Sequence, residues 1–369
     1  MLRLWSRKDK SDRETGTLLK KVQQNPDNRE LLLEVVDHYE QRRSYETTLT
    51  HLEKLIALEP SEPDYCRRTG VILRKLQRPE KALAMFEEAS RLAPDDQEAQ
   101  VNQVKCLLDL GRLDEAEKRV RNLLSKHPKR PLSSYAYGLL LKSQGKTNEA
   151  IEAFRRTLDL DDRFARAHTN LGLLYDKSGD KERAVTHFRR AIRLEPERPE
   201  WHLNLGAVYA EKKMIREAMA EFEEALRLDG QNVEAHFNLA MIHHDQGEFE
   251  EAIREFKAAV ELEPDNIKAH YLLGRAYIRR GLYERAKKQM NKVIALDPEN
   301  AQAYYNLGVA ENKREQIDEA IAALEKAITI NPEDARPYYY LGIVYDKKGV
   351  DEKAREAYRT ADRLLQGQR

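Results

Sequence analysis

The feature that most constrains this chain is a repeat of 34 residues. In the segment 165–198, apolar side chains such as Leu171 and Tyr175 lie at helical spacing, a Ser-Gly-Asp break follows at 178–180, and a second apolar stripe ends at Pro196. Proline lacks an amide hydrogen and sterically blocks further helix, so it ends the second stripe. The segment predicts two amphipathic helices joined by a short turn.

The same pattern continues without insertion or deletion from residue 29 to residue 368. Ten units begin at residues 29, 63, 97, 131, 165, 199, 233, 267, 301 and 335. Position 20 is alanine in nine of them, with Thr48 as the exception: Ala82, Ala116, Ala150, Ala184, Ala218, Ala252, Ala286, Ala320 and Ala354. Because a single helix pair cannot bury its own apolar faces, such units must stack on one another.

A small residue at positions 8 and 20, an aromatic residue at positions 11 and 24, and proline at position 32 resemble the tetratricopeptide repeat (TPR) family over about nine-tenths of the chain. The resemblance implies an all-α fold, a right-handed α-α superhelix of helix-turn-helix repeats. It also implies a concave groove lined by the first helix of each repeat.

Differences between the units predict three regions. Residues 1–28 form a basic N-terminal segment with a capping helix, and 29–130 form three divergent repeats that place Val36 and Val104 at the usually small position 8. Residues 131–369 form seven regular repeats. Their last helix carries Asp362 at a usually apolar position, which predicts a polar C-terminal cap where the array ends.

The composition argues against several classes of function. The chain has 64 basic and 64 acidic residues, so no net field attracts nucleic acid or an anionic membrane. No apolar run is long enough to span a membrane or to act as a secretory signal, and the two cysteines, Cys66 and Cys106, suit buried thiols in a reducing compartment. We expect a cytoplasmic protein without cofactor. Since no catalytic motif occurs, we expect no enzyme activity.

Three columns of side chains predict a peptide-binding groove. An asparagine recurs at position 6, where its amide can pair with both the N–H and the C=O of an extended peptide. Aromatic rings recur at position 5, and positions 9 and 13 add further groove residues. The predicted set is Asn102, Asn170, Asn204, Asn238, Asn306, Tyr135, Phe237, Tyr271, Tyr305, Tyr339, Met241, Arg275 and Lys313. Sideways packing between first helices is the alternative for the rings.

Basic residues on the same face are compatible with an acidic peptide, but a solvated face of mixed charge is the favoured interpretation. These residues include Arg166, Lys177, Lys268, Arg275, Arg279, Lys313, Arg336 and Lys347. Some TPR domains bind a chaperone's terminal carboxylate with lysine at position 5 and asparagine at position 9. No unit here has either residue at those positions, so that kind of clamp is not expected.

Two further features have mainly structural interpretations. Histidine occupies position 4 of four successive units, and His236, His243 and His270 are weak candidates for a metal site; structural histidines are the favoured interpretation. Near the N-terminus, Leu2, Leu4 and Trp5 lie among basic residues. They are a weak candidate for an interfacial contact with a membrane or partner, and a frayed terminus is the favoured interpretation.

The sequence therefore predicts a non-catalytic scaffold or adaptor that binds a peptide or helical segment of one or more proteins in its groove. An RNA-binding helical array and a self-assembling structural scaffold are the alternatives. The partner and the oligomeric state are left open.

Overall fold

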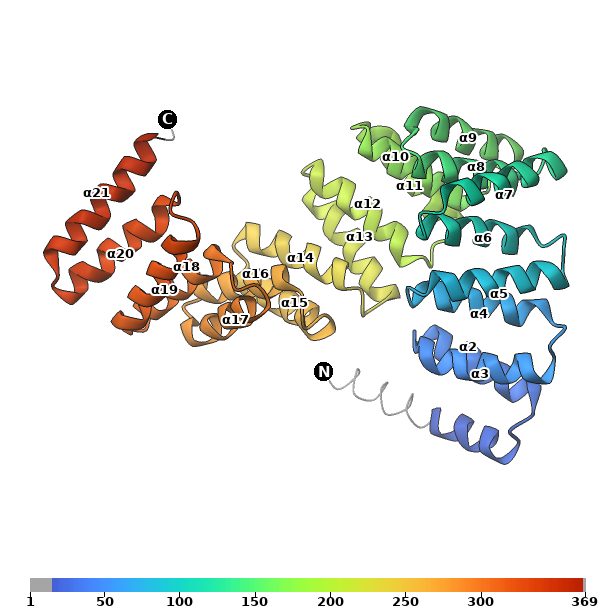
Figure 1. Ribbon diagram of the computed structural model, residues 1–369, viewed down its shortest axis with the longest axis horizontal. Coiled ribbons are helices and arrows are strands. Elements are labelled where there is room, and N and C mark those ends of the chain that lie inside the picture. Colours follow the sequence, from blue (N-terminus) through green and yellow to red (C-terminus); the bar gives the residue numbers. More distant parts are fainter. Residues whose placement is uncertain (1–14, 368–369) are drawn as a thin grey trace. The chain divides into compact units, whose positions relative to one another are not determined.

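A computed structural model describes residues 15–367, so the predicted contact through Leu2, Leu4 and Trp5 lies outside the described part. Within 15–367 the chain is built of helices joined by short turns and contains no strand (Figure 1). The helices follow one another in pairs, which makes the chain an all-α solenoid of tandem helix pairs.

The first helix of each pair begins at the residue where the 34-residue register begins. These helices are α2 (Arg29–Gln41), α4 (Pro63–Lys75), α6 (Gln97–Asp109), α8 (Pro131–Ser143), α10 (Ala165–Lys177), α12 (Pro199–Glu211), α14 (Val233–Gln246), α16 (Ile267–Arg279), α18 (Ala301–Lys313) and α20 (Ala335–Lys348). The second helices are α3 (Tyr45–Leu58), α5 (Pro79–Leu92), α7 (Leu113–Lys126), α9 (Thr147–Leu160), α11 (Lys181–Leu194), α13 (Ile215–Leu228), α15 (Phe249–Leu262), α17 (Tyr283–Leu296), α19 (Ile317–Ile330) and α21 (Asp351–Gly367).

Local signals explain these boundaries. Asparagine or aspartate precedes several first helices, and its side chain accepts a hydrogen bond from a backbone N–H of the first turn, as Asn300 does from Ala303 at 3.0 Å. Other first helices begin with proline, whose fixed φ suits the first helical position, as at Pro199. The turn inside each pair has one residue at positive φ, always at position 15 of the unit.

The two helices of a pair interlock through positions 8 and 24. A Cβ atom added to Gly206 would lie 2.7 Å from Cε1 of Phe222, and one added to Gly138 would lie 2.6 Å from Cε1 of Phe154. Both rings are fully buried. The large residue at position 24 therefore packs directly on the helix backbone where the glycine has no side chain.

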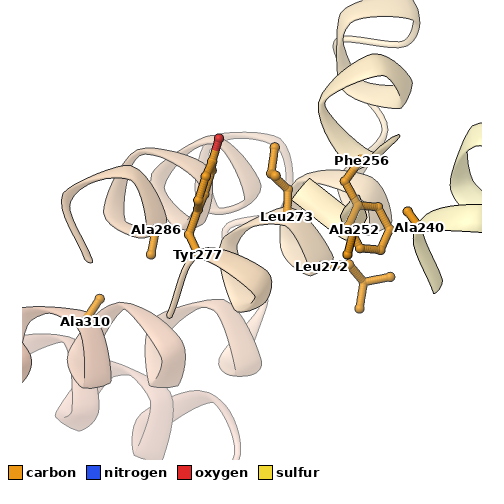
Figure 2. Close-up of a cluster of buried hydrophobic side chains, with 8 residues drawn as sticks. All are labelled: Ala240, Ala252, Phe256, Leu272, Leu273, Tyr277, Ala286 and Ala310. Carbon is orange, nitrogen blue, oxygen red and sulfur yellow. The ribbon is translucent and has the colours of Figure 1, made fainter. Parts of the chain in front are cut away.

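Neighbouring pairs share a continuous core. Figure 2 shows one cluster, in which Phe256 of α15 packs with Leu272 and Leu273 of α16, and the cluster continues to Ala286 of α17 and Ala310 of α18. Because each pair completes the core of the next, the helices are stabilised mainly by stacking rather than by propensity.

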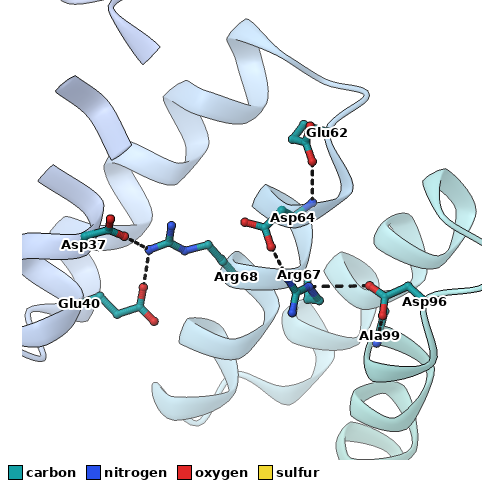
Figure 3. A network of polar contacts seen from close by, with 8 residues as sticks. All are labelled: Asp37, Glu40, Glu62, Asp64, Arg67, Arg68, Asp96 and Ala99. Carbon is teal, nitrogen blue, oxygen red and sulfur yellow. Dashed lines mark hydrogen bonds and ion pairs between the residues drawn. The ribbon is translucent and has the colours of Figure 1, made fainter. Parts of the chain in front are cut away.

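The early repeats add ion pairs between first helices. Arg68 of α4 reaches back to Asp37 at 2.5 Å and to Glu40 at 2.7 Å on α2, while Arg67 lies 3.7 Å from Asp96 at the start of α6 (Figure 3).

Before α2, residues 15–24 are helical and Val22 is buried. The Thr15 hydroxyl lies 2.8 Å from Nε2 of His38.

The chain divides into two compact units, with the boundary after Ser178 in the turn between α10 and α11. The predicted division at residue 130 rests on repeat quality and stays a prediction. Both cysteines are free and buried. Among the described helices, none has the length and apolar character needed to cross a membrane.

Position 15 yields a stability prediction. Six of its residues are glycine, but Arg43, Gln77, Lys213 and Glu315 adopt the same left-handed conformation with φ between 55° and 62°. A side chain there costs roughly 1 kcal/mol. We expect Glu315→Gly to raise the free energy of unfolding by about 1 kcal/mol in denaturant titrations, and Gly281→Ala, at φ 71°, to lower it by a similar amount. A Glu315→Gly variant less stable than the wild type would contradict this assignment.

Candidate peptide-binding groove

The first helices of three consecutive pairs enclose a surface cavity of about 470 Å³ in the second unit. We call it the arginine–tyrosine pocket. Its lining comes only from α16, α18 and α20: Tyr271, Arg275, Ile278, Arg279, Gln302, Tyr305, Asn306, Val309, Arg336 and Tyr340. The structure therefore brings four predicted groove residues together, namely Tyr271, Arg275, Tyr305 and Asn306.

Asn306 is held in place but keeps a free acceptor. Its Nδ2 donates to the Tyr271 hydroxyl at 3.2 Å and to the carbonyl of Gln302 at 2.8 Å. Its Oδ1 has no hydrogen-bond partner among residues 15–367. An amide fixed on one side and open on the other is able to accept a hydrogen bond from a peptide N–H.

The tyrosines form the pocket wall. The rings of Tyr305 and Tyr340 meet edge to face with centroids 5.4 Å apart. Burial, followed by the neighbouring Tyr340, raises the pKa of Tyr305 to about 12, so this phenol remains a neutral donor at physiological pH. Such rings give a rigid contact surface at low entropic cost.

Arginines stand beside these rings. The guanidinium of Arg275 lies 5.8 Å from the centroid of Tyr271, and that of Arg336 lies 5.4 Å from the centroid of Tyr305. Arg336 donates a hydrogen bond to Asp334, the N-cap of α20. This hydrogen bond holds the pKa of the Asp334 carboxyl below its usual range. The pocket is thus positively charged and aromatic.

Two further cavities lie along the first helices of the same unit. One, of about 490 Å³, is lined partly by Asn238 and Met241 of α14 and includes the acidic Glu211 and Asp245. The other, of about 240 Å³, contains Phe237, whose ring has Lys268 Nζ 4.9 Å from its centroid. Phe237 also packs edge to face on Phe256, so packing between helices accounts for part of its surface.

The other predicted groove residues of this unit lie outside these cavities. Asn204 is half-buried on α12, and Lys313 is exposed on α18. Tyr339 on α20 is 53% exposed, and its ring contacts those of Tyr340 and Tyr358. Tyr339 is therefore available at the surface but does not line the arginine–tyrosine pocket.

In the first unit, the corresponding side chains bind one another. Tyr135 is only 4% exposed; Asn170 Nδ2 donates to its hydroxyl at 3.4 Å, and the guanidinium of Arg166 lies 5.5 Å from its ring centroid. Arg166 also pairs with Glu98 of α6, so an ion pair between α6 and α10 crosses over α8. Tyr135 consequently presents little surface to a ligand.

The two asparagines of this unit are engaged as well. Asn170 Oδ1 accepts from Lys142 Nζ at 2.9 Å, and Asn102 Oδ1 accepts from Lys105 Nζ at 3.1 Å. Burial, and then the positive charge of Arg166, lowers the pKa of Lys105 to about 8. Unlike Asn306, neither asparagine keeps an unused carbonyl oxygen here.

The histidines at position 4 connect successive repeats. In each case Nε2 faces the carbonyl of position 32 in the preceding unit: His168 with Asp162, His202 with Pro196, His236 with Gly230 and His270 with Pro264. In His202, His236 and His270 the other ring nitrogen, Nδ1, reaches the second helix, as in the 2.6 Å contact of His236 with Glu255.

These contacts do not assemble a metal site from the weak candidates. His236 and His270 use both ring nitrogens in hydrogen bonds, and His243 faces Glu248. Residues 15–367 contain no group of three or more histidine, cysteine, aspartate or glutamate side chains placed to hold a metal ion. The structural interpretation of the histidines fits their contacts.

The sequence reasoning missed some lining residues. Gln302 and Ile278 occupy positions 2 and 12, and Tyr340 replaces the usual asparagine at position 6. All three lie on the face of the first helices that lines the pocket. The sequence analysis selected residue types that recur at one position from unit to unit. Gln302, Ile278 and Tyr340 do not recur in this way, so it did not single them out.

Comparisons with known proteins agree with this architecture. Tetratricopeptide repeat models match residues 32–97, 73–140, 135–194, 177–213 and 201–232. A model described as the C-terminal domain of cilia and flagella-associated protein 70 matches residues 218–366. No curated protein matches the chain.

Several solved structures are similar to parts of this chain. MamA is 29% identical over 44% of this chain and 96% of its own, with a TM-score of 0.43. YrrB, described as a TPR protein with an unusual peptide-binding site, is 28% identical over 51% and 96%, with a TM-score of 0.48. The anaphase-promoting complex assembly Cut9–Hcn1 is 17% identical over 85% and 66%, with a TM-score of 0.55, a likeness that concerns the fold alone.

The helix pairs define the chain as a helical repeat protein. It belongs to the tetratricopeptide repeat family, as the repeat models along its length and the register of its helices show.

The histidine contacts predict a pH dependence. The Glu221 carboxylate, together with the Pro196 carbonyl, raises the pKa of His202. For His236, burial is the largest single effect and lowers the pKa, but the hydrogen bonds to Glu255 and to the Gly230 carbonyl, with the nearby negative charges, together raise it above its usual value. A raised folded-state pKa stabilises the fold fully below the unfolded value of about 6.5, and this stabilisation is lost as pH rises through the folded value. We expect the unfolding free energy contributed by these groups to fall from pH about 6 to pH about 8.

Replacing the glutamate partners of both histidines tests whether these contacts cause the pH dependence. Urea titrations across that range should show a flatter profile for Glu221→Gln with Glu255→Gln than for the wild type. The matched pair Glu223→Gln with Glu261→Gln changes the same charge on α13 and α15 and should keep the wild-type slope. Equal slopes for both double variants would disprove the assignment.

Proposed function

We propose that this protein is a non-catalytic scaffold that binds an extended segment of a partner protein across α16, α18 and α20. The tetratricopeptide fold itself supports a protein-interaction scaffold. The observation that supports binding across these three helices is the arginine–tyrosine pocket. Its lining comes from three successive first helices and from no second helix.

The pocket chemistry favours an extended peptide over a helix. The free Oδ1 of Asn306 can accept from a backbone N–H, which an extended segment offers and a helix uses internally. Beside it, Tyr271 and Tyr305 provide aromatic surface, and Gln302 provides an exposed amide. The proposed location is the cytoplasm, because the free cysteines suit a reducing compartment.

A bulky residue at the pocket edge tests this function. Gln302 is exposed and lines the pocket, so Gln302→Trp should fill the cavity without disturbing the buried core. We expect peptides selected from a random displayed library on the full-length wild-type protein to lose at least about tenfold in affinity for this variant, roughly 1.4 kcal/mol. Fluorescence anisotropy with the selected peptides gives the measurement.

Lys257→Trp is the matched control, because Lys257 is exposed on the second helix α15 and lines none of the three cavities described above. It should bind the selected peptides as the wild type does. If both tryptophan variants retain full affinity, the peptides bind elsewhere and the proposed site is wrong. Binding of RNA oligonucleotides at physiological salt, with no peptide selected from the library, would favour the nucleic-acid alternative.

A further inference from the structure

The arginine–tyrosine pocket has an unbalanced charge. Its described lining includes Arg275, Arg279 and Arg336 but no aspartate or glutamate. Arg336 is neutralised by Asp334, whereas Arg275 and Arg279 form no ion pair with any residue in 15–367. Both are exposed. Two arginines therefore line the cavity without a protein anion.

Some exposed arginines of this unit pair with an acidic neighbour on the same helix. Arg227 pairs with Glu224 at 2.6 Å, and Arg254 pairs with Glu251 at 3.4 Å. Arg275 and Arg279 instead lie one helical turn apart on α16, a spacing at which like charges repel. An anion bound between them removes this repulsion and gains charge-assisted hydrogen bonds.

The two guanidinium groups are also held by aromatic rings. Arg275 lies over Tyr271 with 5.8 Å between guanidinium carbon and ring centroid, and Arg279 lies over Phe249 at 5.9 Å. Such contacts restrict the long side chains before a ligand arrives, which reduces the ordering cost of binding. Arginine presents paired N–H donors that match a carboxylate.

The charge at position 13 of the first helices changes from negative to positive between α14 and α16. Position 13 is acidic in α12 and α14, at Glu211 and Asp245, and basic in α16, α18 and α20, at Arg279, Lys313 and Lys347. Position 9 is apolar in α14 and α18, at Met241 and Val309, yet it is Arg275 between them. The basic character thus extends along the same three helices that line the pocket.

We infer that the arginine–tyrosine pocket binds an acidic extended segment of a partner protein, with glutamate or aspartate side chains on Arg275 and Arg279. This inference rests on the proposed function and specifies its ligand. The backbone N–H of the segment donates to Asn306 Oδ1, and its acidic side chains lie along α16. The recognised groups are side-chain carboxylates distributed along a segment.

The test uses the full-length protein and a short labelled peptide of alternating glutamate and alanine, blocked at both ends. We expect the wild type to bind it, and Arg275→Gln with Arg279→Gln to weaken binding about tenfold, because the variant loses both cations that pair with the peptide carboxylates. The peptide with glutamine in place of glutamate should not bind. Thermal melts establish that the variant is folded.

The matched control is Arg216→Gln with Arg254→Gln, which removes the same charge from the second helices α13 and α15 and should retain wild-type affinity. Equal weakening by both double variants, or equal binding of the glutamine peptide, would overturn the inference, as would absence of binding to the wild type. If Gln302→Trp abolishes binding and the Arg275/Arg279 variant does not, the groove function stands and the acidic ligand is wrong. If neither variant affects binding, both proposals fail.

Discussion

The structure depends on a close contact inside most helix pairs, between a glycine at position 8 and a large residue at position 24. Phe222 packs on the backbone at Gly206, and Tyr358 does the same at Gly342, where an added Cβ would lie only 2.5 Å from the ring. The register of 34 residues repeats this contact, and stacking then buries the remaining apolar faces in a shared core. Where position 8 is larger, as at Val104, position 24 is smaller, as at Val120, and both are buried.

This arrangement leaves the open face of the first helices to vary. In the first unit, Arg166, held by Glu98, lies over Tyr135, and Lys142 binds Asn170, so the chain satisfies these groups itself. In the second unit, the pocket on α16, α18 and α20 keeps unpaired arginines and a free amide oxygen. One repeat architecture thus carries a surface whose polar groups bind one another in the first unit and a surface with unpaired polar groups in the second.

The sequence was sufficient to predict the helix pairs, because periodic apolar residues, proline and small residues at fixed positions are local signals. It predicted that Tyr271, Arg275, Tyr305 and Asn306 share a face, and they line one cavity. It could not predict that Tyr135 is covered, because that depends on an ion pair between residues 68 positions apart. Nor could it assign the position-4 histidines their contacts, since the carbonyl of the preceding repeat and the acid on the second helix are brought together only by folding.

The central claim is that ligand binding takes place on the first helices α16, α18 and α20, and photo-crosslinking tests it most directly. A glutamate-rich peptide carrying one benzophenone side chain, irradiated with the full-length protein, should attach to residues of these three helices, as mapped by mass spectrometry of the digested product. Excess unlabelled peptide should suppress the reaction. Crosslinks confined to the second helices α17 and α19, or to α8 around the covered Tyr135, would contradict the account.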